Sequence, residues 1–245
     1  MEKHNGAMPR NCYDAEFWGA ADCTNTTCPY HIEDGPMKCE AAAGCLDARK
    51  RRWAAMTDIL PFPDKRYTVI YADPPWAYRQ AGATQKARGT AVKHYPTMTT
   101  AEICALPVRE ICGGGSACFL WATFPNIGDG IKALEAWGFE YKTAAFVWVK
   151  KNPKNGRNFW GMGAYTRANA EVCLLGVSKD FKAGQQVRSH SVHQIIEAPF
   201  EGHSKKPDEA RRRIVELLGD VPRIELFARQ RADGWDAWGN EAPAE

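Results

Sequence analysis

The sequence predicts an α/β fold in which a doubly wound, mostly parallel β-sheet is covered by helices. From Arg66 onward, short β-branched and aromatic runs alternate with amphipathic helical segments, which is the pattern of repeated strand–helix–strand units. The length of 245 residues suits one domain of this class with a small additional region. Ligands of such sheets bind at the carboxyl ends of the strands, so the segments that follow the strands are the candidate functional sites.

The predicted elements follow one another in order after residue 66. The strands are expected at 67–72, 117–121, 146–149, 172–175 and 223–227, and the helices at 126–137 and 208–218. The strand segments are rich in β-branched and aromatic residues, which suits burial within a sheet. A capping box of Thr99 and Glu102 starts a further short helix, which stops near Pro107. Gly138 is placed to end the helix before it in a left-handed conformation, and residues 150–169 are expected to form a loop.

Residues 1–56 form a separate Cys-rich region with a basic helix at its end, and residues 57–245 form the predicted α/β domain. Five of the nine cysteines fall within the first 45 residues, and no signal peptide precedes them, so a disulfide framework is not expected. Candidate ligands of a structural zinc ion are Cys23, Cys28, Cys39 and Cys45. Free buried thiols and a disordered tail are the alternatives that the spacing leaves open.

The charge pattern is compatible with a nucleic-acid partner. The net charge is +3, and the basic residues cluster at 49–52, 150–157 and 205–213. Such clusters can bind phosphate groups, although a solvated surface is an equal alternative. No apolar run approaches the roughly 18 residues that cross a membrane, so a cytoplasmic protein without a membrane partner is expected. The sequence does not define the oligomeric state, and a homodimer is one alternative.

The candidate catalytic site is Asp73-Pro74-Pro75-Trp76, directly after the first predicted strand. Two consecutive prolines restrict the backbone and remove two N–H donors, so the loop suits a flat group with an amine better than a phosphate. If Asp73 and the Pro74 carbonyl accept the two N–H groups of an adenine amine, the nitrogen lone pair can point at an electrophilic methyl group. Trp76 is expected to stack on the base. A simple turn with a core tryptophan is the alternative.

The sequence resembles the adenine N6-methyltransferases of the MTA seventy-kilodalton-subunit family, which includes the catalytic subunit of the eukaryotic messenger-RNA adenosine methyltransferase. The resemblance runs from about Asp58 to Glu241. Besides the tetrapeptide, the matching segments are 95–98, 119–121, 137–139, 147–150, 171–176, 206–209 and 224–229, in the order of the family. The resemblance implies a Rossmann-like fold, S-adenosylmethionine as cofactor, and a catalytic motif that precedes the cofactor motif. A bacterial or phage member is expected from the compact chain.

The resemblance also implies positions that bind cofactor and substrate. The implied cofactor residues are Asp58, Ile59, Asp73, Lys206, Phe227, Arg229, Asn240 and Glu241. Lys206 matches a lysine beside the methionine part of the cofactor, and Arg229 and Asn240 match residues at its ribose and adenine. The candidates on the substrate side are Tyr78 and Tyr95, together with Lys150, Trp160 and Arg167 in or next to the predicted loop.

The chain departs from the family at several of these positions. Gln230-Arg231-Ala232 stands where the eukaryotic enzymes have Pro-His-Asn, so the ribose contacts of that His-Asn pair do not carry over. Glu241 replaces a glutamine and can accept but not donate a hydrogen bond. The glycine-rich cofactor loop of many DNA methyltransferases is absent, since 227–230 stands in its place.

The main hypothesis is N6 methylation of adenine in double-stranded DNA, with the target base flipped out of the duplex. The basic and aromatic loop at 150–167 could follow the backbone and stack unpaired bases, or it could only shape the site. The alternatives are adenine methylation in RNA and a non-catalytic nucleic-acid-binding subunit with a methyltransferase-like fold. Cytosine N4 methylation shares the amine chemistry, but the wider pattern favours adenine.

Overall fold

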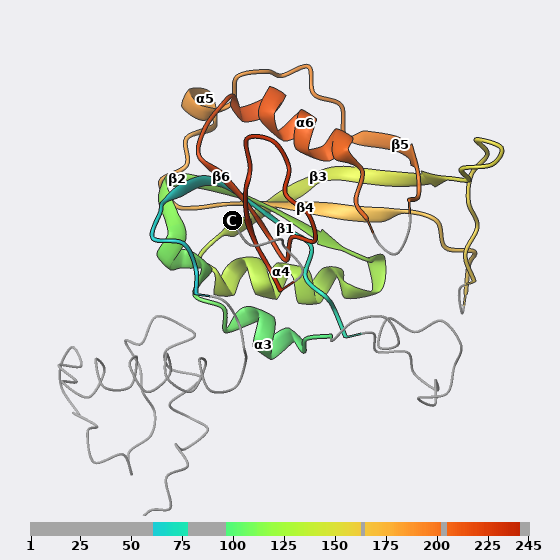
Figure 1. Ribbon diagram of the computed structural model, residues 1–245, viewed down its shortest axis with the longest axis horizontal. Coiled ribbons are helices and arrows are strands. Elements are labelled where there is room, and N and C mark those ends of the chain that lie inside the picture. The colour runs from blue at the N-terminus through green and yellow to red at the C-terminus, as the bar shows by residue number, and fades with distance from the viewer. Residues whose placement is uncertain (1–60, 78–96, 163–164, 202–204, 241–245) are drawn as a thin grey trace, which may run out of the picture. The chain divides into compact units, whose positions relative to one another are not determined.

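In the computed structural model, which describes residues 61–77, 97–162, 165–201 and 205–240, seven strands form one sheet. The order of the strands across the sheet is β5-β3-β4-β2-β1-β6-β7 (Figure 1). Their bounds are β1 Tyr67–Ala72, β2 Cys112–Ala122, β3 Glu140–Lys151, β4 Glu171–Val177, β5 Ile195–Pro199, β6 Arg223–Leu226 and β7 Asp236–Trp238. Only β4 runs antiparallel to its neighbours, β2 and β3, and the other four pairings are parallel. The expected mostly parallel sheet is therefore confirmed.

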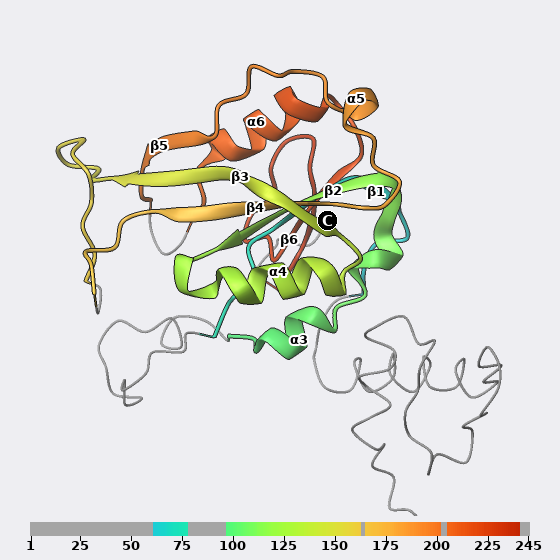
Figure 2. The same ribbon diagram turned by 180° about the vertical axis from the view of Figure 1, so that it is seen from behind.

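Helices cover both faces of this sheet, as a doubly wound fold requires. The helices are α3 Thr100–Cys104, α4 Ile127–Ala136, α5 Ala183–Gln186 and α6 Asp208–Leu218, with short 3₁₀ turns η2 Val108–Ile111 and η3 Phe124–Asn126. Helices α3 and α4 lie on one face, and α5 and α6 lie on the other (Figures 1 and 2). Within the described residues, no helix is both long enough and apolar enough to cross a membrane.

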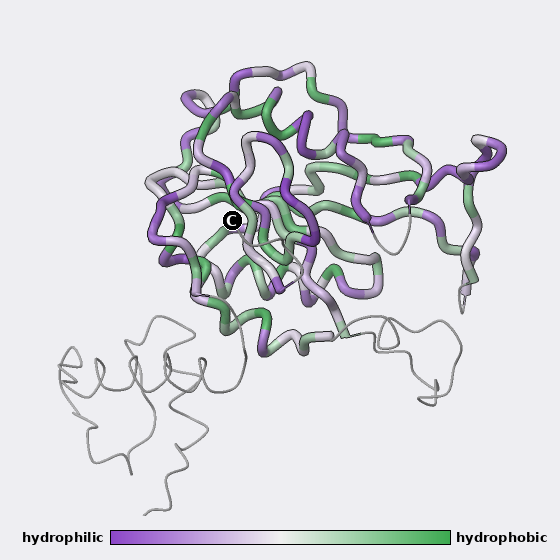
Figure 3. Tube along the Cα trace, in the orientation of Figure 1, coloured by the Kyte–Doolittle hydropathy of each residue, from purple (hydrophilic) through white to green (hydrophobic). Residues whose placement is uncertain are grey.

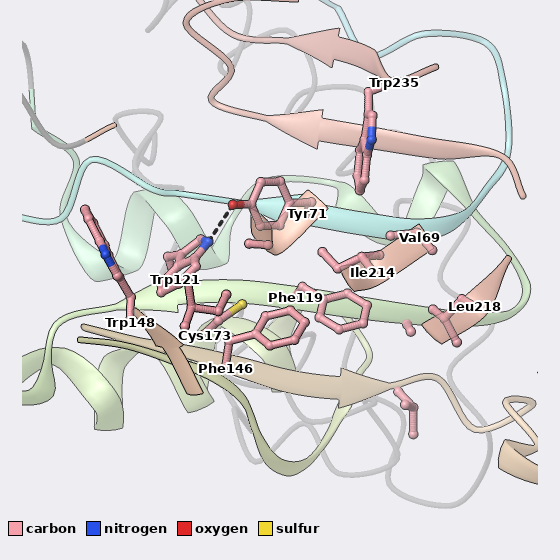
Figure 4. Packing of buried hydrophobic residues seen from close by; sticks show 14 residues of the cluster. Val69, Tyr71, Phe119, Trp121, Phe146, Trp148, Cys173, Ile214, Leu218 and Trp235 are labelled. Carbon is pink, nitrogen blue, oxygen red and sulfur yellow. Dashed lines mark hydrogen bonds between the residues drawn. The ribbon is translucent and has the colours of Figure 1, made fainter. Parts of the chain in front are cut away.

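The main apolar core lies between the sheet and α6. Figure 4 shows its aromatic side chains, among which Trp121 Nε1 donates a 2.8 Å hydrogen bond to Tyr71 Oη. Ile214 and Leu218 of α6 belong to the same buried cluster. Figure 3 shows that apolar residues concentrate in the central strands, whereas hydrophilic residues follow the end of β3. The carboxyl ends of the central strands are thereby held on a rigid, close-packed base.

A buried ion pair fixes α6 to the sheet. The guanidinium of Arg211 on α6 donates to both carboxylate oxygens of Glu225 on β6, at 2.7 and 2.9 Å. Burial raises the pKa of Glu225, although Arg211 acts in the opposite direction. This bidentate geometry sets the position of α6, and hence of the residues just before it, relative to β6.

Most elements fall where the sequence predicts them, and the differences have local causes. Strands β2 and β3 are both longer than predicted. Strand β2 starts earlier because it includes the glycine run 113–115, where its register against β1 shifts. Strand β6, predicted at 223–227, ends one residue early because Phe227 adopts a left-handed φ of 60°. Gly138 has the expected positive φ, 87°. The edge strands β5 and β7 were not predicted, since each is short and pairs on one side only.

The capping box at the start of α3 gives a stability prediction. Thr99 Oγ1 accepts the N–H of Glu102 at 3.2 Å, and the Glu102 carboxylate accepts the N–H of Thr99 at 2.7 Å. Thr99→Ala removes one of these bonds and should lower the free energy of unfolding by about 1 kcal/mol, as measured by chemical denaturation. Thr100→Ala, one residue inside the helix, is the control; an equal loss in both variants would contradict the capping role.

Candidate active site

The Asp73-Pro74-Pro75-Trp76 loop follows β1 directly and is held in a fixed conformation. Trp76 N–H donates to the Pro74 carbonyl at 2.8 Å, and Met98 N–H donates to the Pro75 carbonyl at 2.8 Å. Ala77 N–H in turn donates to the Met98 carbonyl at 3.1 Å. The Pro75 carbonyl is thus tied to the segment before α3, whereas the one bond that the Pro74 carbonyl accepts from the described residues lies within the loop.

Trp76 forms part of the wall of the site. Its indole is only 7% exposed, and its Nε1 donates to the carbonyl of Trp121 at 2.9 Å. This bond joins the loop to the end of β2 and leaves the ring little freedom to rotate. That Trp76 stacks on a base stays a prediction.

Four charged side chains from four separate segments alternate in sign across the site. Lys206 Nζ lies 2.7 Å from Asp73 Oδ2 and 3.2 Å from Glu171 Oε2, and Lys150 Nζ lies 2.5 Å from Glu171 Oε1. Lys206 precedes α6 and its side chain is 7% exposed. Glu171 is the first residue of β4, which is antiparallel, so it lies at the edge where β1, β2 and β3 end.

The charge states of this network follow from burial and from the neighbouring charges. Burial would lower the pKa of Lys206, but the two carboxylates beside it raise that pKa above its ordinary value. Burial would raise the pKa of Glu171, but Lys206 and Lys150 together hold it below its ordinary value. Burial raises the pKa of Asp73 even with Lys206 beside it. Asp73 is therefore the member of the network whose charge is most sensitive to its surroundings.

A pocket at the carboxyl ends of β1 and β2 gathers these groups. It is lined by Asp73, Pro74, Pro75, Trp76, Trp121, Ala122, Thr123, Glu171, Lys206 and Arg229. The sequence predicted the loop, Lys206 and Arg229 as site residues, but not the other lining residues. The end of β2 could have been found from the rule that ligands meet strand ends, whereas Glu171 could not, because it begins a strand.

The segment after β6 approaches the site through an unusual backbone. Phe227 has a positive φ and packs its ring against Trp238, with ring centroids 5.6 Å apart. Gly239 lies so close to this segment that a Cβ atom there would meet the backbone N and O of Ala228 at 2.7 Å. Arg229 reaches the pocket, while Asn240 is exposed and does not line it.

The predicted substrate residues near the loop between β3 and β4 have different surroundings. Lys150 lies at the base of the loop in the charge network, and the side chain of Asn169 hydrogen-bonds both its N–H and its carbonyl. Arg167 donates to the carbonyls of Gly161 and Trp160, at 2.9 and 3.2 Å, so it braces the loop. Trp160 is 55% exposed. Lys150 thus belongs to β3, so the loop begins two residues later than the expected residue 150, whereas Trp160 and Arg167 lie in the loop itself. Within the described residues the three do not line one pocket.

Several predicted site residues lie outside the described residues. They are Asp58, Ile59, Tyr78, Tyr95, Glu241 and the four proposed zinc ligands Cys23, Cys28, Cys39 and Cys45. The proposed boundary at residue 56 lies there as well. In the part of the chain that is described, no group of three or more His, Cys, Asp or Glu residues could hold a metal ion.

Known proteins match the greater part of this chain. It is 34% identical over 203 residues to the Type II methyltransferase M.MunI of Mycoplasma sp, covering 77% of this chain and 83% of that protein. It is 28% identical over 186 residues to the N(6)-adenosine-methyltransferase catalytic subunit METTL3 of Homo sapiens, covering 72% of this chain and 28% of that protein. The match to the N(6)-adenosine-methyltransferase MT-A70-like protein of Arabidopsis thaliana, at 28% over 182 residues, covers 71% of this chain and 24% of that protein. The chain thus spans about a quarter of the length of the human and plant proteins. The MT-A70 family model matches residues 67–241, which include the whole charge network and the segment after β6, and the chain belongs to the MT-A70 family.

Proposed function

We propose that this protein is an S-adenosylmethionine-dependent methyltransferase that methylates N6 of adenine in double-stranded DNA. The observation that carries the proposal is a pair of acceptors at the end of β1. Asp73 Oδ2 is engaged by Lys206, but no hydrogen bond from the described residues reaches Asp73 Oδ1. The Pro74 carbonyl accepts one bond from Trp76 and retains a second lone pair. Two acceptors match the two N–H groups of an adenine amine.

These acceptors would act by orientation and electrostatics. The lone pair of an aromatic amine is delocalised into the ring, so the nitrogen is a weak nucleophile until its hydrogens are held out of the ring plane. Bonds to Asp73 Oδ1 and to the Pro74 carbonyl would hold them there. The carboxylate would also stabilise the positive charge that develops on nitrogen as the N–C bond forms. Lys206 keeps Asp73 in place while the amine binds.

The residues around the pocket fit S-adenosylmethionine by their chemistry. The cofactor supplies an electrophilic methyl group on a sulfonium cation. The carboxylate of Asp73 suits a cation, and Lys206 suits the carboxylate of the methionine part. Phe227, Arg229 and Asn240 lie on the segments after β6 and β7. The resemblance implies that Arg229 and Asn240 contact the ribose and adenine of the cofactor.

Duplex DNA as the substrate is supported by the relative that matches the greater part of both chains. That relative is named a Type II methyltransferase, a class that modifies DNA, whereas the proteins named for adenosine match over about a quarter of their length. A target adenine must leave the helix to reach the pocket, and exposed aromatic residues such as Trp160 and Tyr165 could stack on the unpaired bases. RNA is the second candidate, favoured by the names of the adenosine-specific relatives.

Transfer of a labelled methyl group from S-adenosylmethionine to matched duplex DNA, single-stranded DNA and RNA would test the proposal. We expect label on N6 of adenine in the duplex, and modification-sensitive sequencing of DNA from expressing cells would identify the target sequence. Label that enters only RNA would replace DNA with RNA as the substrate. Nucleic-acid binding without any calorimetric signal for S-adenosylmethionine would instead indicate a non-catalytic subunit.

The contact between Gly239 and Ala228 predicts a selective defect in cofactor binding. In Gly239→Ala the new methyl group meets backbone atoms at 2.7 Å, so the segment with Phe227 and Arg229 must move. We expect KM for S-adenosylmethionine to rise about tenfold, with KM for DNA unchanged, because a small displacement of a binding segment loses well-placed contacts. Gly184→Ala, where no atom lies within 4 Å of the new Cβ, is the control. Equal effects on both KM values would contradict the assignment.

A further inference from the structure

Thr123 directly follows β2, and its hydroxyl group forms no hydrogen bond with the described residues. Its oxygen is buried, and no described residue comes within hydrogen-bonding reach of it. Thr123 occupies the N-cap position of η3, where a threonine hydroxyl commonly accepts a backbone N–H, but no such bond forms. The turn is closed by the backbone alone, through Asn126 N–H and the Thr123 carbonyl at 2.8 Å. A buried polar group without a partner destabilises the folded chain, so its presence needs a reason.

Thr123 lines the same pocket as Asp73, on the side away from the segment after β6. Strand β2 lies between β1 and β4, and Ala122 pairs with Val172, so Thr123 follows at the edge where Asp73 and Glu171 lie. Phe227 and Arg229 follow β6, on the opposite side of β1. A cofactor on the β6 side therefore leaves the β2 side of Asp73 for the target base.

Recognition of the adenine ring on that side would use a hydrogen-bond donor. The amine of adenine is flanked by two ring nitrogens, N1 and N7, and both are acceptors. Asp73, Glu171 and the Pro74 carbonyl are acceptors, and Lys206 is engaged by two carboxylates. The Thr123 hydroxyl is a neutral donor at this wall, and rotation about its Cα–Cβ bond can turn it towards a bound base.

We propose that the Thr123 hydroxyl donates a hydrogen bond to N1 or N7 of the target adenine and is a specificity-determining residue. This inference rests on the proposed adenine methylation. A hydrogen bond to N7 and one to N1 differ in whether they exclude cytosine as a target base. A bond to N7 would also reject cytosine, which carries a C–H group at the matching position beside its amine. A bond to N1 would not, because cytosine has an acceptor on that side as well.

Substrate analogues and two variants of the full chain test the bond directly. Wild type, Thr123→Val and Thr123→Ser are compared on duplexes that carry adenine, 1-deazaadenine or 7-deazaadenine at the target position. Thr123→Val should lower kcat/KM on adenine about three- to tenfold, and Thr123→Ser should retain most activity. On the analogue that lacks the bonded nitrogen, wild type and Thr123→Val should be equal. Equal rates on 1-deazaadenine would identify N1 as the acceptor, and equal rates on 7-deazaadenine would identify N7.

Thermal stability separates this role from a structural one. Because valine removes an unpaired buried oxygen and keeps the shape, Tm of Thr123→Val should equal or exceed that of wild type. A fall in Tm with equal loss on all three substrates would overturn the inference, and so would unchanged kcat/KM on adenine. If wild type itself transfers no methyl group to adenine, the proposed function fails and the inference fails with it. If adenine is methylated but Thr123→Val lowers kcat/KM equally on adenine and on both analogues, the inference fails while the proposed function stands.

Discussion

Asp73→Asn should lower kcat/KM for methyl transfer by about two to three orders of magnitude while the protein stays folded. Removal of one preorganised electrostatic contact to a reacting centre commonly has an effect of this size. The amide oxygen of asparagine can still accept one N–H of the amine. It carries no charge to stabilise the cationic nitrogen, however, and its NH₂ group must face either Lys206 or the base. Orientation and charge stabilisation are lost together.

Initial rates with labelled cofactor, combined with thermal unfolding, would measure this effect. Asp73→Asn removes one of the two carboxylates beside the buried Lys206, but Glu171 still faces that ammonium, and the cost of burying the Asp73 charge is removed as well. Tm should therefore fall moderately, and the variant should stay folded at the assay temperature. Asp180→Asn, an exposed carboxylate after β4, is the control and should leave both quantities unchanged. Undiminished transfer by a folded Asp73→Asn protein would refute the mechanism.

The position of Asp73 could be predicted from the sequence because two local signals coincide there. The run from Tyr67 to Ala72 has the composition of a buried strand, and the two prolines that follow end it, so the carboxylate had to lie at the end of a strand. The helix at 208–218 was also predicted from the sequence, but Lys206, just before it, was identified as a site residue only by the family resemblance. Local composition was therefore sufficient for the position of Asp73 but not for the role of Lys206.

Glu171 and Thr123 could not be assigned in this way, because their roles depend on the pairing of strands distant in the sequence. Glu171 reaches the site only because β4 is antiparallel between two parallel neighbours, which no local pattern encodes. The sequence around Thr123 is that of an ordinary N-cap residue, and only the structure shows that its hydroxyl accepts no backbone N–H. The burial of Trp76, fixed by the Trp121 carbonyl, likewise depends on the contact between two strand ends.

Lys206→Met should lower both stability and activity, because Lys206 is the cation shared by Asp73 and Glu171. Removing one partner of a buried ion pair typically costs about 3 kcal/mol or more, since the remaining charge stays buried. Lys150 still faces Glu171, so the larger penalty falls on Asp73. Lys205→Met is the matched control. Lys205 is the adjacent residue and pairs on the surface with Glu201 and Asp208, so its loss should cost less than about 1 kcal/mol.

The pH dependence of Lys206→Met identifies Asp73 as the affected group. Without the opposing charge, burial raises the pKa of Asp73 further than in wild type. The acid limb of the kcat/KM profile should therefore move to higher pH, because a protonated Asp73 cannot stabilise a cationic amine. The folded variant then binds a proton that the unfolded chain has released, so its stability falls as the pH rises through the raised pKa. Denaturation at about pH 5 and about pH 8 should show the larger deficit at the higher pH. A deficit that is independent of pH, with an unshifted acid limb, would mean that Lys206 does not control the charge of Asp73.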